Sequence, residues 1–242
     1  MQTSFTFHTK FAKTVFKELT MYEQNQMLFS YEELYRWCSP KSVRGVIHVG
    51  AHLCEEIHYY NALQLKNDNV IWVEANPDHV KQSRMMYPQA RIIEALCTDV
   101  EGQTYTFKIT SNEGQSSSIL DFGVHAIHHP HVKFVDEMQL TSTCLETIIT
   151  PETVGDSTFK NLNMMNLDVQ GAELLVLKGA TKILPQIDYI YIEVNIDEVY
   201  KGCAQLPEMD AFLDGHGFQR VCEKIYSEYK WGDALYVRKT LL

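Results

Sequence analysis

Short runs rich in Val, Ile and Leu alternate along the chain with segments in which apolar residues recur every three or four positions. The short runs are typical of buried strands, and the three-to-four spacing is typical of amphipathic helices. Strands are predicted at 45–49, 70–73, 91–96, 162–167 and 189–192, with helices at 55–65, 77–86 and 171–184. This alternation predicts an α/β fold built on a parallel sheet.

The segments outside this alternation predict additions to the sheet. Strict apolar–polar alternation predicts strands at 104–109 and 139–148, and the polar stretch 151–161 is expected to be a surface loop. A short helix at 208–215 precedes two successive strands, 218–222 and 234–238. The fold class expected is therefore a doubly wound, mostly parallel sheet with an antiparallel last strand.

The first part of the chain has a helical pattern of its own. Apolar residues recur at three and four over 5–37, and Ser39-Pro40 ends the pattern. The expected organisation is an N-terminal helical extension at 1–44, followed by one domain at 45–242. The extension is expected to pack on the sheet, although it could instead cover a site or form a homodimer contact.

Composition narrows the class of protein. The 242 residues are 45% hydrophobic and carry a net charge of -10, which suits one domain and argues against nucleic acid as the main partner. No apolar run is long enough for a membrane span, and the polar N-terminus does not look like a secretory signal. Six scattered cysteines without a CxxC pair suggest reduced thiols and a cytoplasmic location.

The segment 46–56 predicts a strand, a tight turn at Gly50 and a helix. Glycine lets a ligand approach the backbone, and a helix start offers free N–H groups. About 20 residues on, the next strand ends in Glu74, which could accept hydrogen bonds from both ribose hydroxyls. Further strands also end in polar residues, at Asp99, Asp168 and Glu193. Together these residues predict a nucleotide site at the carboxyl ends of the strands.

Several motifs resemble those of the FkbM-type family of S-adenosylmethionine-dependent methyltransferases and follow one another in the same order as in that family. They are His48-Val49-Gly50-Ala51-His52, Trp72-Val73-Glu74-Ala75-Asn76-Pro77, Ser116-Ser117-Ser118-Ile119-Leu120, Leu167-Asp168-Val169-Gln170-Gly171-Ala172-Glu173, Ile192-Glu193-Val194-Asn195 and Gly232-Asp233-Ala234-Leu235-Tyr236. The resemblance covers residues 45 to 239 and implies the seven-stranded methyltransferase sheet.

The resemblance also implies where S-adenosylmethionine would bind. Gly50 and its neighbours would line the methionine part, Glu74 would hold the ribose, and Asp168 would lie near the sulfonium and the acceptor. Cys97, Thr98 and Asp99 would lie near the adenine. The full expected cofactor set is His48, Gly50, Ala51, His52, Glu56, Glu74, Ala75, Asn76, Cys97, Thr98, Asp99, Ser117 and Asp168.

Two residues depart from the family pattern. His48 stands where the family more often has Asp, and Cys54 stands where it more often has Gly. His48 offers no fixed negative charge to the cofactor's ammonium, so Glu55, Glu56 or Asp168 would have to supply it. Cys54 makes the turn less permissive.

The expected reaction is O-methylation of a hydroxyl on a sugar, a glycan or another small hydroxylated metabolite. The acceptor proton needs a base or a metal. His125, in a histidine-rich loop, is the candidate base, although such a loop is more often only surface. Asp168, Glu193 and Asn195 are the candidate ligands of Mg²⁺ or Mn²⁺, with Asp168 and Glu193 also counted as catalytic.

Three further residues have candidate roles, and the sequence is also compatible with two alternative functions. Glu173 is expected to bond N–H groups around Gly171, which is a structural role. Trp231 and Asp233 could bind a sugar, although Trp231 is more simply a packing residue. The alternative functions are a non-catalytic binding module of the same fold and an NAD-dependent oxidoreductase, which would need further glycines after Gly50.

Overall fold

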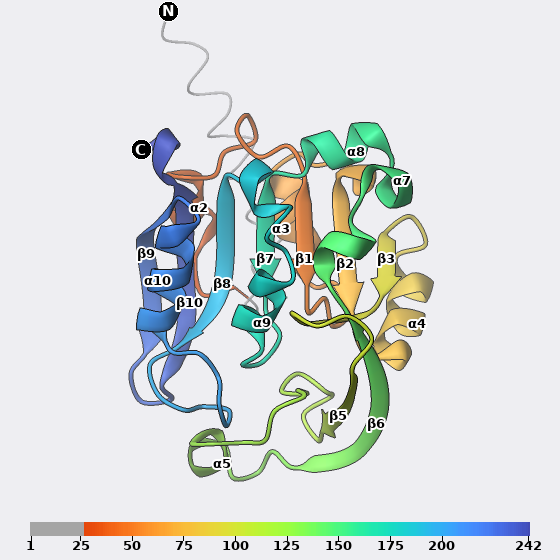
Figure 1. Cartoon of the computed structure of the whole chain (residues 1–242), viewed down its shortest axis with the longest axis vertical. Coiled ribbons are helices and arrows are strands. Elements are labelled where there is room, and N and C mark those ends of the chain that lie inside the picture. Colours follow the sequence, from red (N-terminus) through yellow and green to blue (C-terminus); the bar gives the residue numbers. More distant parts are fainter. Residues whose placement is uncertain (1–26) are drawn as a thin grey trace, which may run out of the picture.

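The computed structural model describes residues 27–242, which form a seven-stranded sheet in the order β3-β2-β1-β7-β8-β10-β9 (Figure 1). The strands are β1 (Val46–Val49), β2 (Val70–Glu74), β3 (Arg91–Glu94), β7 (Met164–Leu167), β8 (Tyr189–Asn195), β9 (Phe218–Tyr226) and β10 (Trp231–Arg238). The first five strands in this order are parallel, and β10 runs antiparallel to both its neighbours. The predicted fold class is confirmed.

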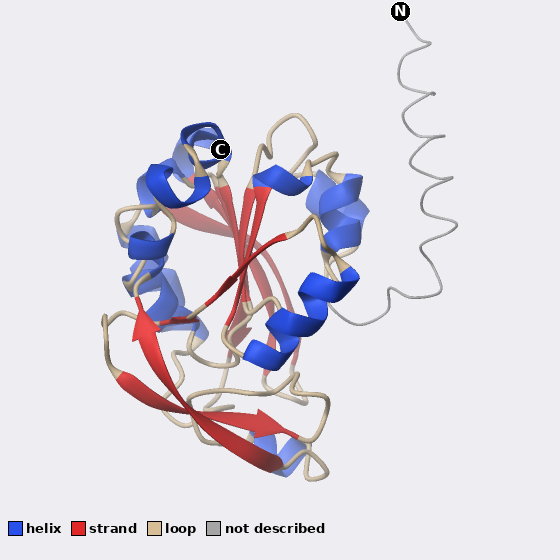
Figure 2. Cartoon of the chain, turned by 90° about the vertical axis from the view of Figure 1, so that its right-hand side faces the viewer, coloured by secondary structure: helices blue, strands red, loops and turns tan. Residues whose placement is uncertain are grey.

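Helices cover both faces of this sheet (Figure 2). They are α2 (Tyr31–Tyr35), α3 (Ile57–Ala62), α4 (Pro77–Met86), α5 (His125–His128), α6 (Leu145–Ile148), α7 (Pro151–Val154), α8 (Asp156–Asn161), α9 (Glu173–Lys178) and α10 (Leu206–Gly215), with 3-10 turns at Asn67–Asn69, Leu184–Gln186 and Lys239–Leu241. In the described part of the chain no helix is both long and apolar enough to cross a bilayer.

A second, three-stranded sheet lies beyond the carboxyl ends of β1 and β2 (Figure 1). It contains β4 (Leu96–Cys97), β6 (Phe134–Thr143) and β5 (Thr104–Thr110), in that order. The predicted strand 91–96 is thereby divided, since β3 ends at Glu94 and Leu96 pairs with β6 in the other sheet. The second sheet and the loops around α5 form one wall of the cavity described below.

Two local predictions from the apolar pattern were wrong. The strand predicted at 139–148 ends at Thr143, and α6 follows because Leu145 and Ile149, four residues apart, are both buried in the core. The loop predicted at 151–161 contains α7 and α8. Thr150 begins α7 by accepting a hydrogen bond from the Thr153 N–H, and Pro151 occupies the first helical turn, where its missing N–H costs nothing.

The two faces of the sheet bury different apolar clusters. One cluster contains Ile47, Val49 and Ile192 with α9 and α10, and the other contains Val46 and Trp72 on the opposite face. The second cluster also includes four residues from the end of the predicted N-terminal extension, namely Phe29, Leu34, Cys38 and Val43. Residues 1–26 of that extension lie outside the described residues, so the boundary at 44 stays a prediction.

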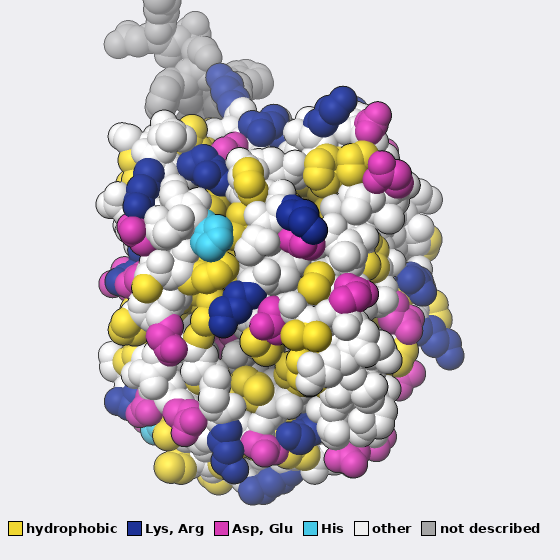
Figure 3. All heavy atoms as spheres, in the orientation of Figure 1, with side chains coloured by type: hydrophobic (Ala, Val, Ile, Leu, Met, Phe, Trp, Pro, Cys, Tyr) yellow, Lys and Arg dark blue, Asp and Glu magenta, His cyan; other side chains and the backbone are white. Residues whose placement is uncertain are grey.

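Figure 3 shows one face of the molecule, on which Lys and Arg side chains are interspersed with Asp and Glu. The basic side chains on this face do not gather into a continuous stripe. This face therefore offers no row of cations along which successive phosphates could bind.

Candidate active site

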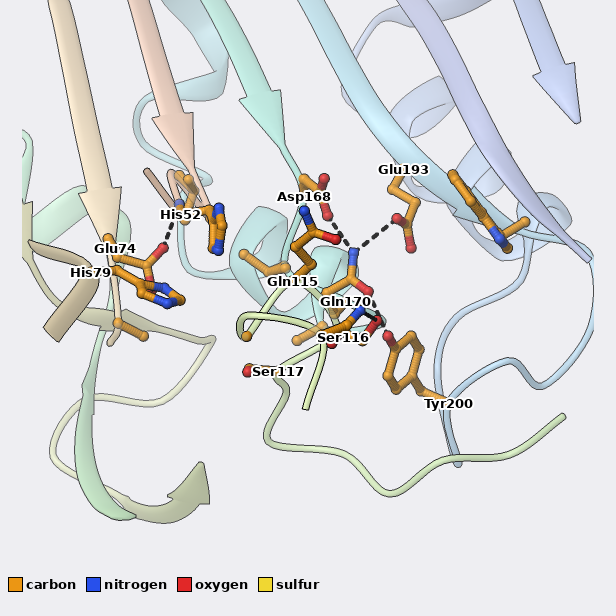
Figure 4. A pocket seen from close by; sticks show the side chains of 18 of the residues that line it. His52, Glu74, His79, Gln115, Ser116, Ser117, Asp168, Gln170, Glu193 and Tyr200 are labelled. Carbon is orange, nitrogen blue, oxygen red and sulfur yellow. Dashed lines mark hydrogen bonds and ion pairs between the residues drawn. The ribbon is translucent and has the colours of Figure 1, made fainter. Parts of the chain in front are cut away.

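A pocket of about 620 Å³ opens at the carboxyl ends of β1, β2, β7 and β8. Figure 4 shows His52, Glu74 and His79 on one side of it and Asp168, Gln170, Glu193 and Tyr200 on the other. The segment carrying Gln115, Ser116 and Ser117 lies between the two groups (Figure 4). The volume lies within the usual range for small-molecule sites.

Gly50 determines how closely the ends of β1 and β7 approach each other. Its φ is +85°, and a Cβ added there would lie 1.6 Å from the Asp168 carbonyl oxygen. Glycine is therefore required at this position. Cys54, the second departure from the family pattern, has a φ of 60°, so a non-glycine residue does hold a left-handed conformation in this turn.

Glu74, at the end of β2, is buried in the pocket wall and oriented by backbone groups. Its Oε2 accepts a hydrogen bond from the His52 N–H at 2.8 Å, and its Oε1 accepts one from the Asn76 N–H at 2.7 Å. Burial raises the pKa of this carboxyl. The two N–H groups hold both carboxylate oxygens in place without neutralising them.

The His52 side chain joins this side of the pocket to the segment 111–118. Its Nδ1 lies 2.7 Å from Glu55 Oε1, and its Nε2 lies 2.9 Å from the Glu113 carbonyl oxygen. Burial alone would lower the pKa of His52, but the hydrogen bond to Glu55 and its charge raise it to about 9. His52 is therefore a cation at neutral pH, adjacent to Glu55 and Glu74.

Gln170 connects the polar groups on the other side. Its Nε2 donates to Asp168 Oδ1 at 2.6 Å and to Glu193 Oε2 at 3.0 Å, and its Oε1 accepts from the Tyr200 hydroxyl. The backbone of Gln170 is left-handed, with a φ of 53°. Burial raises the pKa values of the Asp168 and Glu193 carboxyls, and the Asp168 charge raises that of Glu193 further.

Glu173 has the structural role that its position predicts. Its Oε1 accepts from the Val169 N–H at 3.0 Å and from the Gly171 N–H at 3.1 Å, which satisfies free donors before α9. Burial raises its pKa to about 7. Its carboxyl forms a close group with those of Asp168 and Glu193.

Asp233 extends the acidic side of the pocket onto β10. It lies directly opposite Glu193 in the antiparallel pairing of β8 and β10. Its Oδ2 accepts hydrogen bonds from the Tyr191 hydroxyl and from the Leu28 N–H, and burial raises its pKa to about 7. Two residues before it, Trp231 packs edge-on against Tyr226 at 5.3 Å, and both rings line the pocket.

Ten of the predicted site residues line the pocket: Gly50, His52, Glu56, Glu74, Ala75, Cys97, Ser117, His125, Asp168 and Glu193. Six do not line it: His48, Ala51, Asn76, Thr98, Asp99 and Asn195. Asn76 still contributes indirectly, because its N–H orients Glu74. The roles of all these residues remain predictions.

His48 does not line the pocket, although the resemblance places it in the cofactor site. It faces the second apolar cluster, where its ring stacks on Trp72 and its Nδ1 lies 2.9 Å from the Tyr60 hydroxyl. Burial lowers its pKa to about 3, so it is neutral. The reason is strand alternation, which turns residue 48 to the opposite face from Val49.

Two predicted polar residues are buried without hydrogen-bond partners among the described residues. His125 Nδ1 has none, and neither Oδ1 nor Nδ2 of Asn195 has one. His125 is only 6% exposed and lines the pocket, and burial with neighbouring histidines lowers its pKa to about 4. Buried polar groups are normally paired, so each of these side chains is open to a further interaction.

The sequence interpretation missed Gln170 and Tyr200 as site residues. Gln170 stands within the motif that includes Asp168, and a polar residue two positions after a strand-end acid is a signal that could have marked it. Tyr200 carried no local signal, because it reaches Gln170 from a loop 30 residues further along the chain.

Comparison with known proteins supports the fold and the family. The methyltransferase FkbM domain model matches residues 48–220. A TehB-like S-adenosylmethionine-dependent methyltransferase from Corynebacterium glutamicum has a similar structure, with a TM-score of 0.45 and 9% identity over 97% of this chain and 99% of that chain. No curated protein sequence gives a significant match.

Two further solved structures are similar. Methyltransferase FkbM from Methylobacillus flagellatus has a TM-score of 0.48 and 13% identity over 93% of this chain and 58% of its own. A protein from Listeria monocytogenes has a TM-score of 0.50 and 6% identity over 88% and 68%. Only the Listeria protein reaches a TM-score of 0.50, and at 6% identity its similarity concerns the fold alone. The match of the domain model to most of the sequence shows that the chain belongs to the methyltransferase FkbM domain family.

Proposed function

We propose that this protein transfers the methyl group of S-adenosylmethionine to a hydroxyl of a sugar, a glycan or another small hydroxylated metabolite. The observation that carries the proposal is the Glu74 carboxylate at the end of β2, fixed by two backbone N–H groups in the wall of the pocket. A carboxylate held there can accept hydrogen bonds from both hydroxyls of a ribose. Gly50 at the adjacent strand end also lines the pocket, where its backbone would face the rest of the cofactor.

The two sides of the pocket then have separate tasks. Glu74, with Gly50 and Cys97, would hold the cofactor, and Asp168 would lie near the sulfonium. Glu193 and His125, which also line the pocket, would face the acceptor. The cofactor activates its own methyl group, so the protein mainly aligns the hydroxyl for in-line attack.

Glu193 is the better candidate for removing the hydroxyl proton. A general base works best when its pKa approaches the working pH. Burial raises the pKa of Glu193 well above its usual value, whereas the pKa of His125 falls to about 4. In the proposed step the acceptor oxygen bonds to the methyl carbon as the carbon–sulfur bond breaks, and Glu193 takes the proton.

A divalent cation is the alternative to a general base in this step. Asp168, Glu193 and Asn195 would offer oxygen ligands of the kind that Mg²⁺ prefers. The described geometry fits this poorly, because the Gln170 Nε2 donor lies between the two carboxylates and Asn195 does not line the pocket. We expect full activity in excess chelator, and loss of turnover with intact cofactor binding would favour the metal.

The first experiment is calorimetric titration with S-adenosylmethionine and S-adenosylhomocysteine. Saturable binding is expected, and Glu74→Ala should weaken it by about 1–3 kcal/mol because hydrogen bonds to a charged group are lost. The matched control is Glu94→Ala, since Glu94 lies opposite Glu74 at the end of β3 but is exposed and does not line the pocket.

The outcomes separate the proposed function from its alternative. An unchanged dissociation constant in Glu74→Ala would remove the ribose assignment. Absence of binding to both compounds would favour the non-catalytic module of the same fold. If both compounds bind, an acceptor screen with hydroxylated compounds follows.

A further inference from the structure

The charges lining the pocket are markedly one-sided. Six carboxylates line it, and none of the described lining residues is Lys or Arg. They are Glu55, Glu56, Glu74, Asp168, Glu193 and Asp233. The His52 cation lies beside Glu55 and Glu74, so the other four carboxylates have no adjacent cation among the described lining residues. Buried carboxylates are normally paired with cations or neutralised, so this arrangement favours a positively charged ligand.

The cofactor of the proposed function accounts for only part of this charge. It would bring an ammonium toward Glu56 and a sulfonium toward Asp168. Glu193 and Asp233 remain, on the side assigned to the acceptor. They occupy directly opposite positions on β8 and β10, where side chains of like charge lie about 5 Å apart and repel each other.

Neutral groups are the only hydrogen-bond partners of these two carboxylates in the described chain. Glu193 accepts from Gln170, and Asp233 accepts from Tyr191 and from the Leu28 N–H. Lys224 lies opposite Asp233 on β9, but its Nζ is directed to Glu33, at 2.6 Å, and to the Leu28 carbonyl.

Further features beside the two carboxylates point to a ligand. The Trp231 and Tyr226 rings meet at 66° and line the same pocket, an arrangement that can hold a cation by cation–π attraction. His125, more than nine-tenths buried, lines the pocket with a partnerless Nδ1. A neutral imidazole nitrogen can accept a hydrogen bond from an ammonium or a hydroxyl.

We propose that the acceptor is a hydroxylated compound bearing an amino group, whose ammonium is held by Asp233 beside the Trp231 and Tyr226 rings while its hydroxyl faces Glu193. This inference rests on the proposed function and specifies its substrate class. An ammonium there removes the repulsion between Asp233 and Glu193. An anionic acceptor, such as a phosphorylated or acidic sugar, would meet the same carboxylates and be rejected.

The test compares three sugars of nearly the same shape that differ in charge. The protein saturated with S-adenosylhomocysteine is titrated with glucosamine, glucose and glucuronate, below the pKa of the glucosamine amine. Glucosamine should bind about tenfold tighter than glucose, the gain from one charge-assisted hydrogen bond, and glucuronate should bind most weakly.

The variant Asp233→Asn should abolish the preference for glucosamine. An asparagine can still accept from Tyr191 and Leu28 through its amide oxygen, so the fold should persist, as an unchanged melting temperature would verify. The matched control is Glu228→Gln, since Glu228 is exposed, belongs to the same hairpin and does not line the pocket.

Several results would overturn the inference. They are equal binding of glucosamine and glucose, tighter binding of glucuronate, and absence of binding of all three sugars while S-adenosylhomocysteine binds. Saturable Mg²⁺ binding that Asp233→Asn removes would also overturn it in favour of a metal site. Failure of S-adenosylhomocysteine to bind would overturn the proposed function together with this inference.

Discussion

The carboxylates on the two sides of the pocket have different kinds of partner (Figure 4). On the side of β1 and β2, Glu74 accepts from two backbone N–H groups, and Glu55 faces a His52 cation. On the side of β8 and β10, Glu193 and Asp233 have only neutral donors. Glu55 and Glu74 are therefore compensated within the protein, whereas Glu193 and Asp233 have no cation bonded to them and have raised pKa values.

This difference suits the two ligands of the proposed reaction. A cofactor of fixed structure is best bound by groups held rigidly in advance, because less ordering is then required on binding. An acceptor site can instead contain carboxylates that have no cation in the protein. The acceptor then supplies the cation, so acceptors are selected by their charge. The predictions below test the comparison in order of decreasing expected effect.

The largest effect should come from Gly50→Ala, which acts where the two sides meet. The added methyl group would clash with the Asp168 carbonyl oxygen, and φ is positive, so the ends of β1 and β7 must separate. We expect a loss of about 4 kcal/mol or more in unfolding free energy, measured with urea, because the clash is with backbone that cannot move aside.

The control for this variant is Gly102→Ala. Gly102 also has a positive φ, of +76°, but nothing lies within 4 Å of an added Cβ. It should lose only about 1 kcal/mol, the cost of a left-handed conformation for alanine. Similar losses in both variants would show that the contact with Asp168 does not explain the need for glycine.

The next effect should come from Gln170→Met on the acceptor side. Methionine keeps the length of the side chain but removes the amide that serves Asp168, Glu193 and Tyr200. We expect a loss of about 3 kcal/mol at pH 7, since two buried carboxylates lose a donor. Urea unfolding of Gln186→Met provides the control, because that amide bonds backbone carbonyls away from the pocket.

Gln170→Met also tests whether Gln170 stabilises the fold through the charge of the two carboxylates or through packing. Their pKa values are raised, so at pH 5 they take up protons more readily and depend less on an amide donor. The loss of stability should therefore be smaller at pH 5 than at pH 7. An equal loss at both values would mean that packing around Gln170, and not charge, determines the effect.

The sequence predicted the sheet and one side of the pocket better than the other. Parallel strands buried on both faces appear as apolar runs, and a ligand site follows from the residues that end them, such as Gly50 and Glu74. The acceptor side depends on which residues of different strands lie opposite each other. The pairing of Glu193 with Asp233 joins positions 40 residues apart and is set by the register of β8 and β10.

Some errors came from patterns that have two meanings. Leu145 and Ile149 continue an alternating run but also fit helical spacing, and only tertiary packing decides between the two. His48 stands in a motif whose other members approach the pocket, and strand alternation alone assigns it to the opposite face. Tyr200 could not be predicted, because its contact with Gln170 depends on the path of a loop.

His48→Asn tests the buried face beneath the cofactor side. The pKa of His48 is about 3 in the folded protein, below its usual 6.5. Between these two pH values the unfolded chain binds a proton at His48 and the folded protein does not. The contribution of His48 to the unfolding free energy is therefore present above pH 6.5 and is lost as the pH falls. The loss between pH 7 and pH 5 is about 2 kcal/mol. The stability difference between wild type and His48→Asn should shrink by that amount.

The control is His58→Asn, since His58 is exposed on α3. Its stability difference from wild type should stay constant over the same range, because the His58 side chain is exposed and not enclosed by the core. A constant difference for His48→Asn as well would show that His48 is not held neutral by the core.

The smallest effect should come from His52→Gln, which removes the cation on the cofactor side but keeps a donor that can reach the Glu113 carbonyl. The folded pKa of His52, about 9, lies above its usual 6.5, so its contribution is fully present below pH 6.5 and is lost as the pH rises through 9. The contribution is about 1 kcal/mol, because Glu55 is partly exposed and water screens the pair. Urea unfolding should therefore separate wild type from His52→Gln at pH 6 and bring them together at pH 10. Because the variant keeps the hydrogen bond to Glu113, a difference that persists at pH 10 would show that the positive charge of His52 does not account for the stabilisation, and the contrast in charge between the two sides would lose its support.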